Sequence, residues 1–175
     1  MLFGIGSRET EWGLSKWYVD IDGVEDDDPG DGVGDHGHGR GLMQIDDRWH
    51  EDFVRSGDWK DPRLNILKSA EILRQSYNYL KNRGVSEDAL IHCAIAGYNA
   101  GPGRVWQGLS RGDGPDHFTT GKNYSADVLR RASWWMWHFA SLSLIQRPIS
   151  SVRTLNLDEI PIRPLGVPYS LDGML

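Results

Sequence analysis

Residues 34–46 read GDHGHGRGLMQID, and the rest of the chain can be interpreted around this stretch. Its glycines carry no side chain, so the backbone can turn tightly there and can approach a ligand closely. The apolar run over residues 42–45 predicts a short strand beside that turn. Two carboxylates, Asp35 and Asp46, stand in the turn or next to it. The stretch therefore predicts a small β element at the wall of a groove.

The residues that follow this stretch predict helices. Over residues 63–82, apolar side chains recur at alternating spacings of four and three, which places them along one stripe of a helix. These side chains are Ile66, Ala70, Leu73, Tyr77 and Leu80. A second helix is expected over residues 87–97, with Ser86 as its N-cap, and a third over residues 125–145. Because no other strand pattern is evident, the expected fold class is mainly α.

The first twelve residues are expected to hold the end of a further helix. Leu2, Ile5 and Glu9 recur at helical spacing, so an acidic side chain shares a face with apolar ones. Gly4 and Gly6 oppose this expectation, because a glycine costs about 0.5–1 kcal/mol inside a helix.

Length and composition indicate one domain followed by a tail. A chain of 175 residues, 39% of them hydrophobic, can bury a core without disulfides or a structural metal. From residue 146 onward, prolines interrupt a stretch that lacks a helical stripe, which predicts an extended C-terminal tail over residues 146–175. The globular domain is therefore expected over residues 1–145. Its apolar segment over residues 133–145 is expected to be a buried core helix.

Several features point away from metal or cofactor chemistry. Residues 19–41 form a long loop rich in aspartate and glycine, and its acidic run over residues 25–28 does not match the spacing of an EF-hand. A solvated, charged loop is the favoured interpretation. His36 and His38 have no further ligands nearby in the sequence, so we expect no metal site and no cofactor. The single cysteine, Cys93, lies in an apolar stretch and is expected to be buried and inert.

Charge and hydropathy exclude other classes of protein. The net charge of -6 and the lack of a lysine or arginine cluster argue against a nucleic-acid partner. No apolar run approaches the ~20 residues that span a bilayer, so no membrane insertion is expected. No signal peptide is expected, because no basic segment and no cleavage site precede the first motif. Some of the eight tryptophans are expected to line a groove, since flat aromatic faces suit sugar rings, while most pack in or beside the core.

Three carboxylates and one aromatic–amide pair suggest a site that cleaves carbohydrate. A glycosidic oxygen must be protonated as it departs, which requires a carboxylic acid that keeps its proton near neutral pH. An apolar environment raises the pKa of a glutamate, so Glu9 is the candidate acid. Asp35 or Asp46 could activate water on the opposite face of the sugar. Tyr98 and Asn99, expected at a helix end, could stack on a sugar and hold an acetamido group.

Four segments, taken in order, resemble the goose-type lysozymes, whose core fold is similar to that of the soluble lytic transglycosylases. They are Ser7-Arg8-Glu9-Thr10, the stretch from Gly34 to Asp46, Gly97-Tyr98-Asn99-Ala100-Gly101, and Asn123-Tyr124-Ser125-Ala126-Asp127-Val128. The resemblance spans about residues 4–137 and implies a lysozyme-like fold. The loop between the first two segments is longer and more acidic than is usual in that family.

The resemblance also implies a role for individual residues. Glu9 corresponds to the general acid, and Asp35 and Asp46 correspond to carboxylates that position or activate water. The implied lining of the saccharide groove is Gln44, His50, Tyr98, Asn99 and Tyr124. The implied activity is bacteriolytic cleavage of the β-1,4 bond between N-acetylmuramic acid and N-acetylglucosamine. The implied partner is the glycan strand of peptidoglycan, and the implied place of action is the bacterial cell wall.

Two alternatives stay open at this point. A lytic transglycosylase uses the same acid without external water and forms 1,6-anhydro products. The presence of both Asp35 and Asp46 favours hydrolysis with inversion instead. A non-catalytic wall-binding or virion structural module could use the same fold. The presence of Glu9 argues against that module, because a pure binder does not need a desolvated acid.

Overall fold

The computed structural model describes residues 1–14, 32–35 and 37–145 of the chain. In chain order its elements are α1 (Leu2–Glu9), the 3-10 helix η1 (Glu11–Gly13), β1 (Val33–Gly34), β2 (Gly39–Arg40), β3 (Ile45–Asp46), α2 (Glu51–Arg55), η2 (Asp58–Lys60), α3 (Pro62–Lys81), α4 (Glu87–Ala100), α5 (Pro102–Leu109), η3 (Thr120–Lys122) and α6 (Tyr124–Ile145). The expected mainly α class with a small β element is confirmed, and each predicted helix is present.

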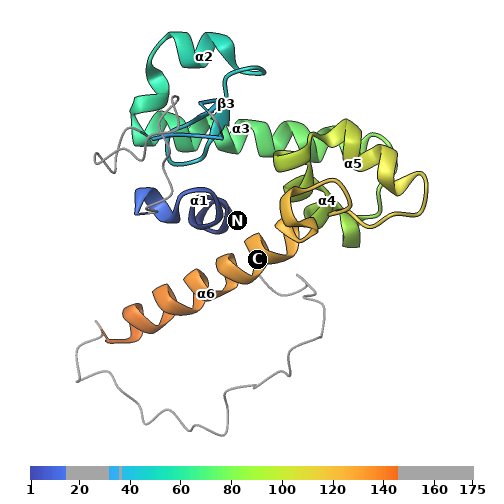
Figure 1. Ribbon diagram of the computed structural model, residues 1–175. Helices are drawn as coiled ribbons and strands as arrows, with labels where there is room; N and C mark the ends of the chain where they lie inside the picture. The colour runs from blue at the N-terminus through green and yellow to red at the C-terminus, as the bar shows by residue number, and fades with distance from the viewer. Residues whose placement is uncertain (15–31, 36, 146–175) are drawn as a thin grey trace, which may run out of the picture. The chain divides into compact units, whose positions relative to one another are not determined.

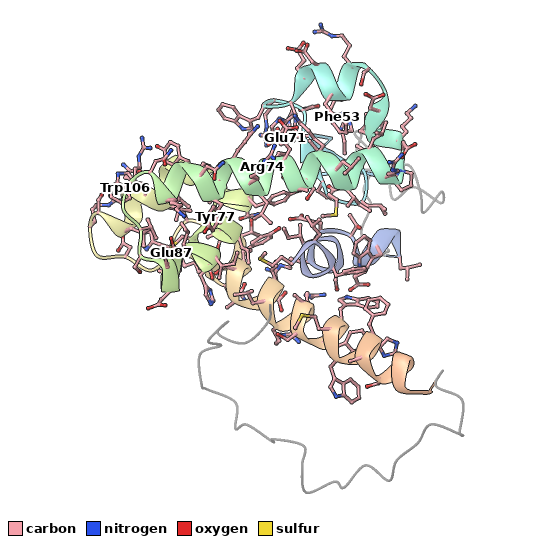
Figure 2. The ribbon with its side chains drawn as sticks, turned by 180° about the vertical axis from the view of Figure 1, so that it is seen from behind. Phe53, Glu71, Arg74, Tyr77, Glu87 and Trp106 are labelled. Atoms are coloured by element: carbon pink, nitrogen blue, oxygen red, sulfur yellow. The ribbon has the colours of Figure 1, made fainter. Side chains whose placement is uncertain are left out.

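Helix α3 is the central helix of the part of the structure before α6, with α2 and β3 on one side of it and α4 and α5 at one of its ends (Figure 1). Asp61 caps the helix by accepting hydrogen bonds from the backbone N–H groups of Arg63 and Leu64, and Pro62 occupies the first turn. Seen from behind, Phe53 of α2 lies beside this helix (Figure 2). The central position of α3 explains why several of its faces are covered.

The most deeply buried face of α3 is not the predicted apolar stripe. Its fully buried residues are Asn65, Ser69, Ser76 and Leu80. Leu80 is the only member of the predicted stripe among them, and the other members are half-buried. Asn65 accepts a hydrogen bond from the Met43 N–H (2.9 Å) and donates one to the carbonyl of Arg40 (3.0 Å). A search for apolar spacing cannot find a polar residue that is buried because its amide is satisfied by another element.

The β element is a three-stranded antiparallel sheet in the order β1-β2-β3. The predicted strand over residues 42–45 is wrong in extent, because residues 41–44 form a turn and only Ile45 belongs to β3. Gln44 ends that turn with a φ of 48°. A Cβ atom at Gly39 would lie 2.2 Å from Oε1 of Gln44, so this glycine lets the turn fold back onto the strand.

Helix α1 packs closely against its neighbours through its two glycines. A Cβ atom at Gly4 would lie 2.2 Å from the carbonyl oxygen of Val128 in α6. A Cβ atom at Gly6 would lie 2.9 Å from the ring of Trp12. Ile5, between them, is completely buried. The glycines that disfavour a helix by themselves are therefore the residues that allow α1 to approach the rest of the core.

Contacts group Met1–His138 into one compact unit and Phe139–Leu175 into another. Of the second unit, the structure describes only residues 139–145, at the end of α6. The expected tail over residues 146–175 and the acidic run over residues 25–28 lie outside the described residues. The domain boundary expected after residue 145 therefore stays a prediction.

The expectation of a buried core helix over residues 133–145 is wrong about burial. The helix is present, but Trp134 and Trp137 are 54% and 69% exposed. Apolar composition does not say which side of a helix is covered, and in α6 the buried side includes Val128 and Ala132. Cys93 is buried, as expected. Among the described residues, no helix is long and apolar enough to cross a bilayer.

Candidate active site

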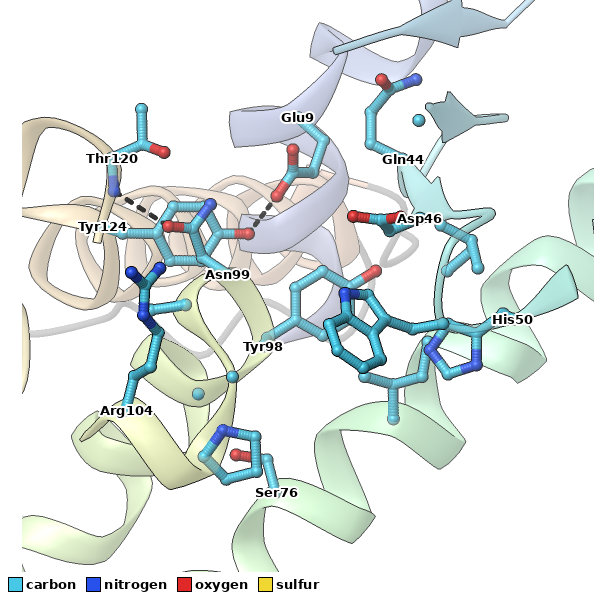
Figure 3. A pocket seen from close by; sticks show the side chains of 18 of the residues that line it. Glu9, Gln44, Asp46, His50, Ser76, Tyr98, Asn99, Arg104, Thr120 and Tyr124 are labelled. Carbon is cyan, nitrogen blue, oxygen red and sulfur yellow. Dashed lines mark hydrogen bonds between the residues drawn. The ribbon is translucent and has the colours of Figure 1, made fainter. Parts of the chain in front are cut away.

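A groove of about 1020 Å³ opens between α1, the β element and helices α3 to α5 (Figure 3). All the residues predicted for the site line it, and they are Glu9, Asp35, Gln44, Asp46, His50, Tyr98, Asn99 and Tyr124. The volume is at the upper end of the range for small-molecule sites, so the groove can hold more than one sugar ring. The fold thus brings together every predicted site residue, whose individual roles stay predictions.

Glu9 occupies the last turn of α1 and receives a hydrogen bond at Oε1 from the hydroxyl of Tyr124. Burial raises the pKa of Glu9 from its ordinary value of 4.5 to about 7. The hydrogen bond from Tyr124 and the positive charge of Arg8 oppose this rise, whereas the negative charge of Asp35 adds to it. A carboxyl group with this pKa keeps its proton in a large share of molecules at neutral pH, as a general acid requires.

An arginine cluster fixes α1 on α6 next to this acid. Asp127 of α6 accepts hydrogen bonds from Arg8 (2.6 Å), Arg130 (2.5 Å) and Arg131 (2.7 Å). Burial alone would raise the pKa of Asp127, but the three arginines hold it well below its usual range. Arg131 also donates to the carbonyl of Ser7 (3.0 Å). The backbone just before Glu9 is therefore anchored by charge-assisted hydrogen bonds.

Asp35 and Asp46 are joined by an arginine that the sequence analysis missed. Asp35 lies in the glycine-rich turn with a φ of 51°, and Asp46 lies in β3. Arg48 donates from Nε to Oδ1 of Asp46 (2.9 Å) and from Nη2 to Oδ2 of Asp46 (2.5 Å). The same Nη2 donates to Oδ2 of Asp35 (3.1 Å). Arg48 therefore holds both carboxylates on one side of the groove.

This arginine also sets the charge of Asp46. Burial by itself would raise the pKa of Asp46, but the hydrogen bonds and the positive charge of Arg48 outweigh burial and lower it. Asp46 is therefore an anion near neutral pH, where Glu9 still carries its proton in a large share of molecules. The only sequence signal for Arg48 is a basic residue two positions after Asp46, and its link to Asp35 depends on the folded turn.

The floor of the groove is tied to the β element by Tyr98, in the last turn of α4. Its hydroxyl donates to the carbonyl of Met43 (2.7 Å), and burial raises its pKa. Gln44 uses its amide nitrogen to donate to the carbonyl of Gly41 (3.0 Å). Asn99 follows Tyr98 and accepts a hydrogen bond at Oδ1 from the N–H of Thr120 (2.9 Å). The NH₂ group of Asn99 is therefore the part of its amide that is oriented by the protein and can serve a ligand.

His50 and Arg104 lie toward opposite sides of the groove in Figure 3, with Tyr98 between them. His50 directly precedes α2 and is half-buried, and this burial, followed by the charge of Lys68, lowers its pKa. Other lining residues that the sequence analysis did not single out are Trp49, Ile72, Gln75, Arg104 and Thr120.

The structure offers no candidate metal centre among the residues it describes. His38, one of the two histidines weighed above as metal ligands, is hydrogen-bonded through Nδ1 to Oδ1 of Asp47 (2.9 Å). His36 lies outside the described residues.

Comparison with known proteins shows the family of this chain. A family model for "Lysozyme g" matches residues 25–138, which is more than half of the chain. The chain belongs to the lysozyme g family. Its membership confirms the resemblance to goose-type lysozymes and the lysozyme-like fold expected from the four motifs. Glu9 precedes the matched range, so its assignment depends on the Ser7–Thr10 motif and on the geometry described above.

Several curated lysozyme g proteins are similar to this chain. "Lysozyme g" of Struthio camelus is 33% identical over 109 residues, which cover 61% of this chain and 50% of that protein. "Lysozyme g" of Takifugu rubripes is 36% identical over 109 residues, which cover 59% and 55%. "Lysozyme g" of Cyprinus carpio is 34% identical over 104 residues, which cover 57% and 50%. The chain spans about half the length of the curated relatives it matches.

Proposed function

We propose that this lysozyme g chain is a peptidoglycan muramidase that hydrolyses the β-1,4 bond between N-acetylmuramic acid and N-acetylglucosamine with inversion. It would act on glycan strands of the bacterial cell wall. The observation that carries the proposal is the pairing, in one groove, of a half-buried acid with a pKa of about 7 and two carboxylates held by an arginine. These are the groups that an inverting glycosidase needs.

Glu9 would supply the proton for the departing sugar. Tyr124 occupies Oε1 of Glu9, and among the described residues no hydrogen bond reaches Oε2. The proton on Oε2 would pass to the glycosidic oxygen as the C1–O bond breaks and its electron pair moves to that oxygen. Tyr124 keeps its own proton, because burial and the negative charge of Glu9 raise its pKa far above neutrality. Tyr124 therefore orients the acid and does not compete with it.

Asp35 and Asp46 would hold the attacking water on the other side of the sugar ring. The oxygen of the water forms the new bond to C1, and one proton of the water passes to a carboxylate. Each carboxylate can accept more hydrogen bonds than those that Arg48 donates. Arg48 is a positioning residue in this scheme, because it touches the carboxylates and not the reacting atoms. Inversion also requires about 6.5–9.5 Å between the acid and the base, which leaves room for the water.

The remaining groove residues would bind the glycan. The NH₂ group of Asn99, oriented by Thr120, would donate to the carbonyl of an acetamido group. The ring of Tyr98, held by Met43, would contact a sugar face. Gln44 and His50 would line the side of the groove that holds Asp46 (Figure 3). Binding by groups already fixed in place limits the entropy lost when the glycan is ordered.

The role of Glu9 is tested by Glu9→Gln, with Glu11→Gln as the matched control. Glu11 is exposed, lies two residues farther along the chain, and loses the same charge in the same way. Release of reducing ends from purified peptidoglycan is expected to fall roughly 10²–10⁴-fold for Glu9→Gln and to stay unchanged for Glu11→Gln. A Glu9→Gln protein within a few-fold of the wild type would contradict the proposal.

The products separate the hydrolytic reaction from its alternatives. Mass spectrometry after digestion in isotopically labelled water should find the label in each new reducing end. Anhydro products without the label would show a transglycosylase and overturn hydrolysis. Proton NMR at early times should find the inverted anomer of the new reducing end. A wild-type protein that binds the wall but releases no fragments would support a non-catalytic module.

A further inference from the structure

Among the tryptophans that the structure describes, Trp49 alone is both highly exposed and part of the groove lining. It is 78% exposed, more than Trp134 or Trp137. Within the described part of the chain, no ring stacks on it and no cation lies over it. Trp59, by contrast, has the guanidinium of Arg40 and the ammonium of Lys60 near its ring. The broad apolar face of Trp49 is therefore open to a ligand in the groove.

The backbone that carries Trp49 is held in place. The N–H groups of Trp49 and His50 both donate to the carbonyl of Asp46 (3.3 and 3.1 Å). The side chain of Asp46 is in turn fixed by Arg48. A ring on such a turn loses little backbone freedom when a ligand binds, which favours affinity.

Other residues that line the groove offer hydrogen-bonding groups as well as apolar surface. Ile72 and Gln75 of α3 line the same groove as Trp49. The amide nitrogen of Gln75 donates to Glu71 (2.9 Å), which leaves its carbonyl oxygen as an acceptor. His50, next to Trp49, can donate from one ring nitrogen and accept at the other while it is neutral. A pyranose ring matches this combination, because it has an apolar C–H face and a rim of polar substituents.

We infer that Trp49 forms a stacking platform for an N-acetylhexosamine ring, as an additional subsite on the His50 side of the groove. The inference rests on the proposed function, since it takes the groove ligand to be a glycan. In Figure 3, His50 lies on one side of Glu9 and both Arg104 and Thr120 lie on the other. A ring stacked on Trp49 would therefore lie to one side of the reacting bond. It would add to strand binding without touching the groups that transfer protons.

The test uses chitohexaose and a protein background that cannot cleave it. Glu9→Gln is the parent, and Trp49→Ala, Trp49→Phe and Trp134→Ala are each added to it. Trp134 is the matched control, because it is exposed on α6 and does not line the groove. Calorimetric titration should give a Kd about 10-fold higher for Trp49→Ala, a magnitude typical of losing one aromatic contact and its buried surface. Trp49→Phe should recover most of that loss, and Trp134→Ala should cause none.

The outcomes separate this subsite from the proposed function. A Trp49→Ala variant that binds within two-fold of its parent, or a Trp49→Phe variant as weak as Trp49→Ala, would overturn the stacking platform alone. A parent that binds no chitohexaose would contradict the glycan groove and the subsite with it. In the active enzyme, Trp49→Ala should raise KM for oligosaccharides and leave kcat within about two-fold, because uniform binding is lost. A fall in kcat with unchanged KM would also overturn the platform.

Discussion

Glu9→Gln is expected to stabilise the folded protein, by an amount that depends on pH. The pKa of Glu9 is about 7 in the folded protein and 4.5 in its ordinary state. Between these two values the folded protein holds a proton that the unfolded chain has released. The free energy of unfolding of the wild type therefore falls as the pH rises from about 4.5 to 7. Below this window Glu9 carries no such penalty, and above it the penalty is constant.

The size of the effect follows from the shift. A rise of 2.5, the difference between 7 and 4.5, corresponds to about 3–4 kcal/mol at about 1.4 kcal/mol for each pKa unit. Glutamine does not ionise, and its amide oxygen can still accept the hydrogen bond from Tyr124. The variant should therefore match the wild type in free energy of unfolding at pH 4 and exceed it by about 3–4 kcal/mol at pH 8. Each kcal/mol corresponds to about 2–4 °C in Tm for a chain of this length.

The assay is urea unfolding followed by circular dichroism at pH 4, 6 and 8. The wild type, Glu9→Gln and Glu11→Gln are compared at each pH, and the exposed Glu11 serves as the control for loss of one negative charge. Relative to the wild type at the same pH, only Glu9→Gln should become more stable as the pH rises from 4 to 8. A gain that is the same at all three values, or equal in the two variants, would refute the claim that burial raises the pKa of Glu9.

Two further predictions concern residues that tie the groove together. Arg48→Met should lower the cleavage rate by up to about 10²-fold, because both aspartates lose their common partner. The acidic limb of its pH–rate profile should also move to higher pH, because loss of the arginine raises the pKa of Asp46. Arg48→Lys should restore part of both effects, and an unmoved acidic limb in Arg48→Met would contradict this role. Asn65→Ala should lower the free energy of unfolding in urea by about 2 kcal/mol, because backbone groups of Arg40 and Met43 lose their hydrogen-bond partner. Asn78→Ala, at an exposed position of the same helix, should change that free energy little. Equal losses for the two asparagine variants would count against that explanation.

Local patterns in the sequence predict the helices well, and ordered motifs predict which residues share the groove. The helix over residues 63–82 was predicted from apolar spacing, and it is present as α3. Glu9, Asp46 and Tyr98 were predicted for one site, and they line one groove. The helices depend on the spacing of neighbouring residues, and the shared site depends on motifs known from a family. Both kinds of pattern can be read in a single sequence.

Features that depend on contacts between distant residues were missed. Arg48 becomes important only because the glycine-rich turn brings Asp35 within reach of its guanidinium. Asn65 is buried because its amide satisfies backbone groups some 22 to 25 positions away in the sequence. The strand expected over residues 42–45 proved to be mostly a turn, because apolar residues fill the core equally well from a turn. Apolar periodicity contains no information on such partners.

The close approach of α1 to α6 limits how this protein could be engineered for heat resistance. Replacing glycine by alanine inside a helix ordinarily adds about 0.4–1 kcal/mol, because the unfolded chain loses freedom. At Gly4 the added methyl group would meet the carbonyl oxygen of Val128, a main-chain atom that cannot rotate away. The helix that carries Glu9 is thus closed to this substitution at Gly4. A more heat-resistant version would have to gain its stability elsewhere, for example at exposed positions of α3 or α4.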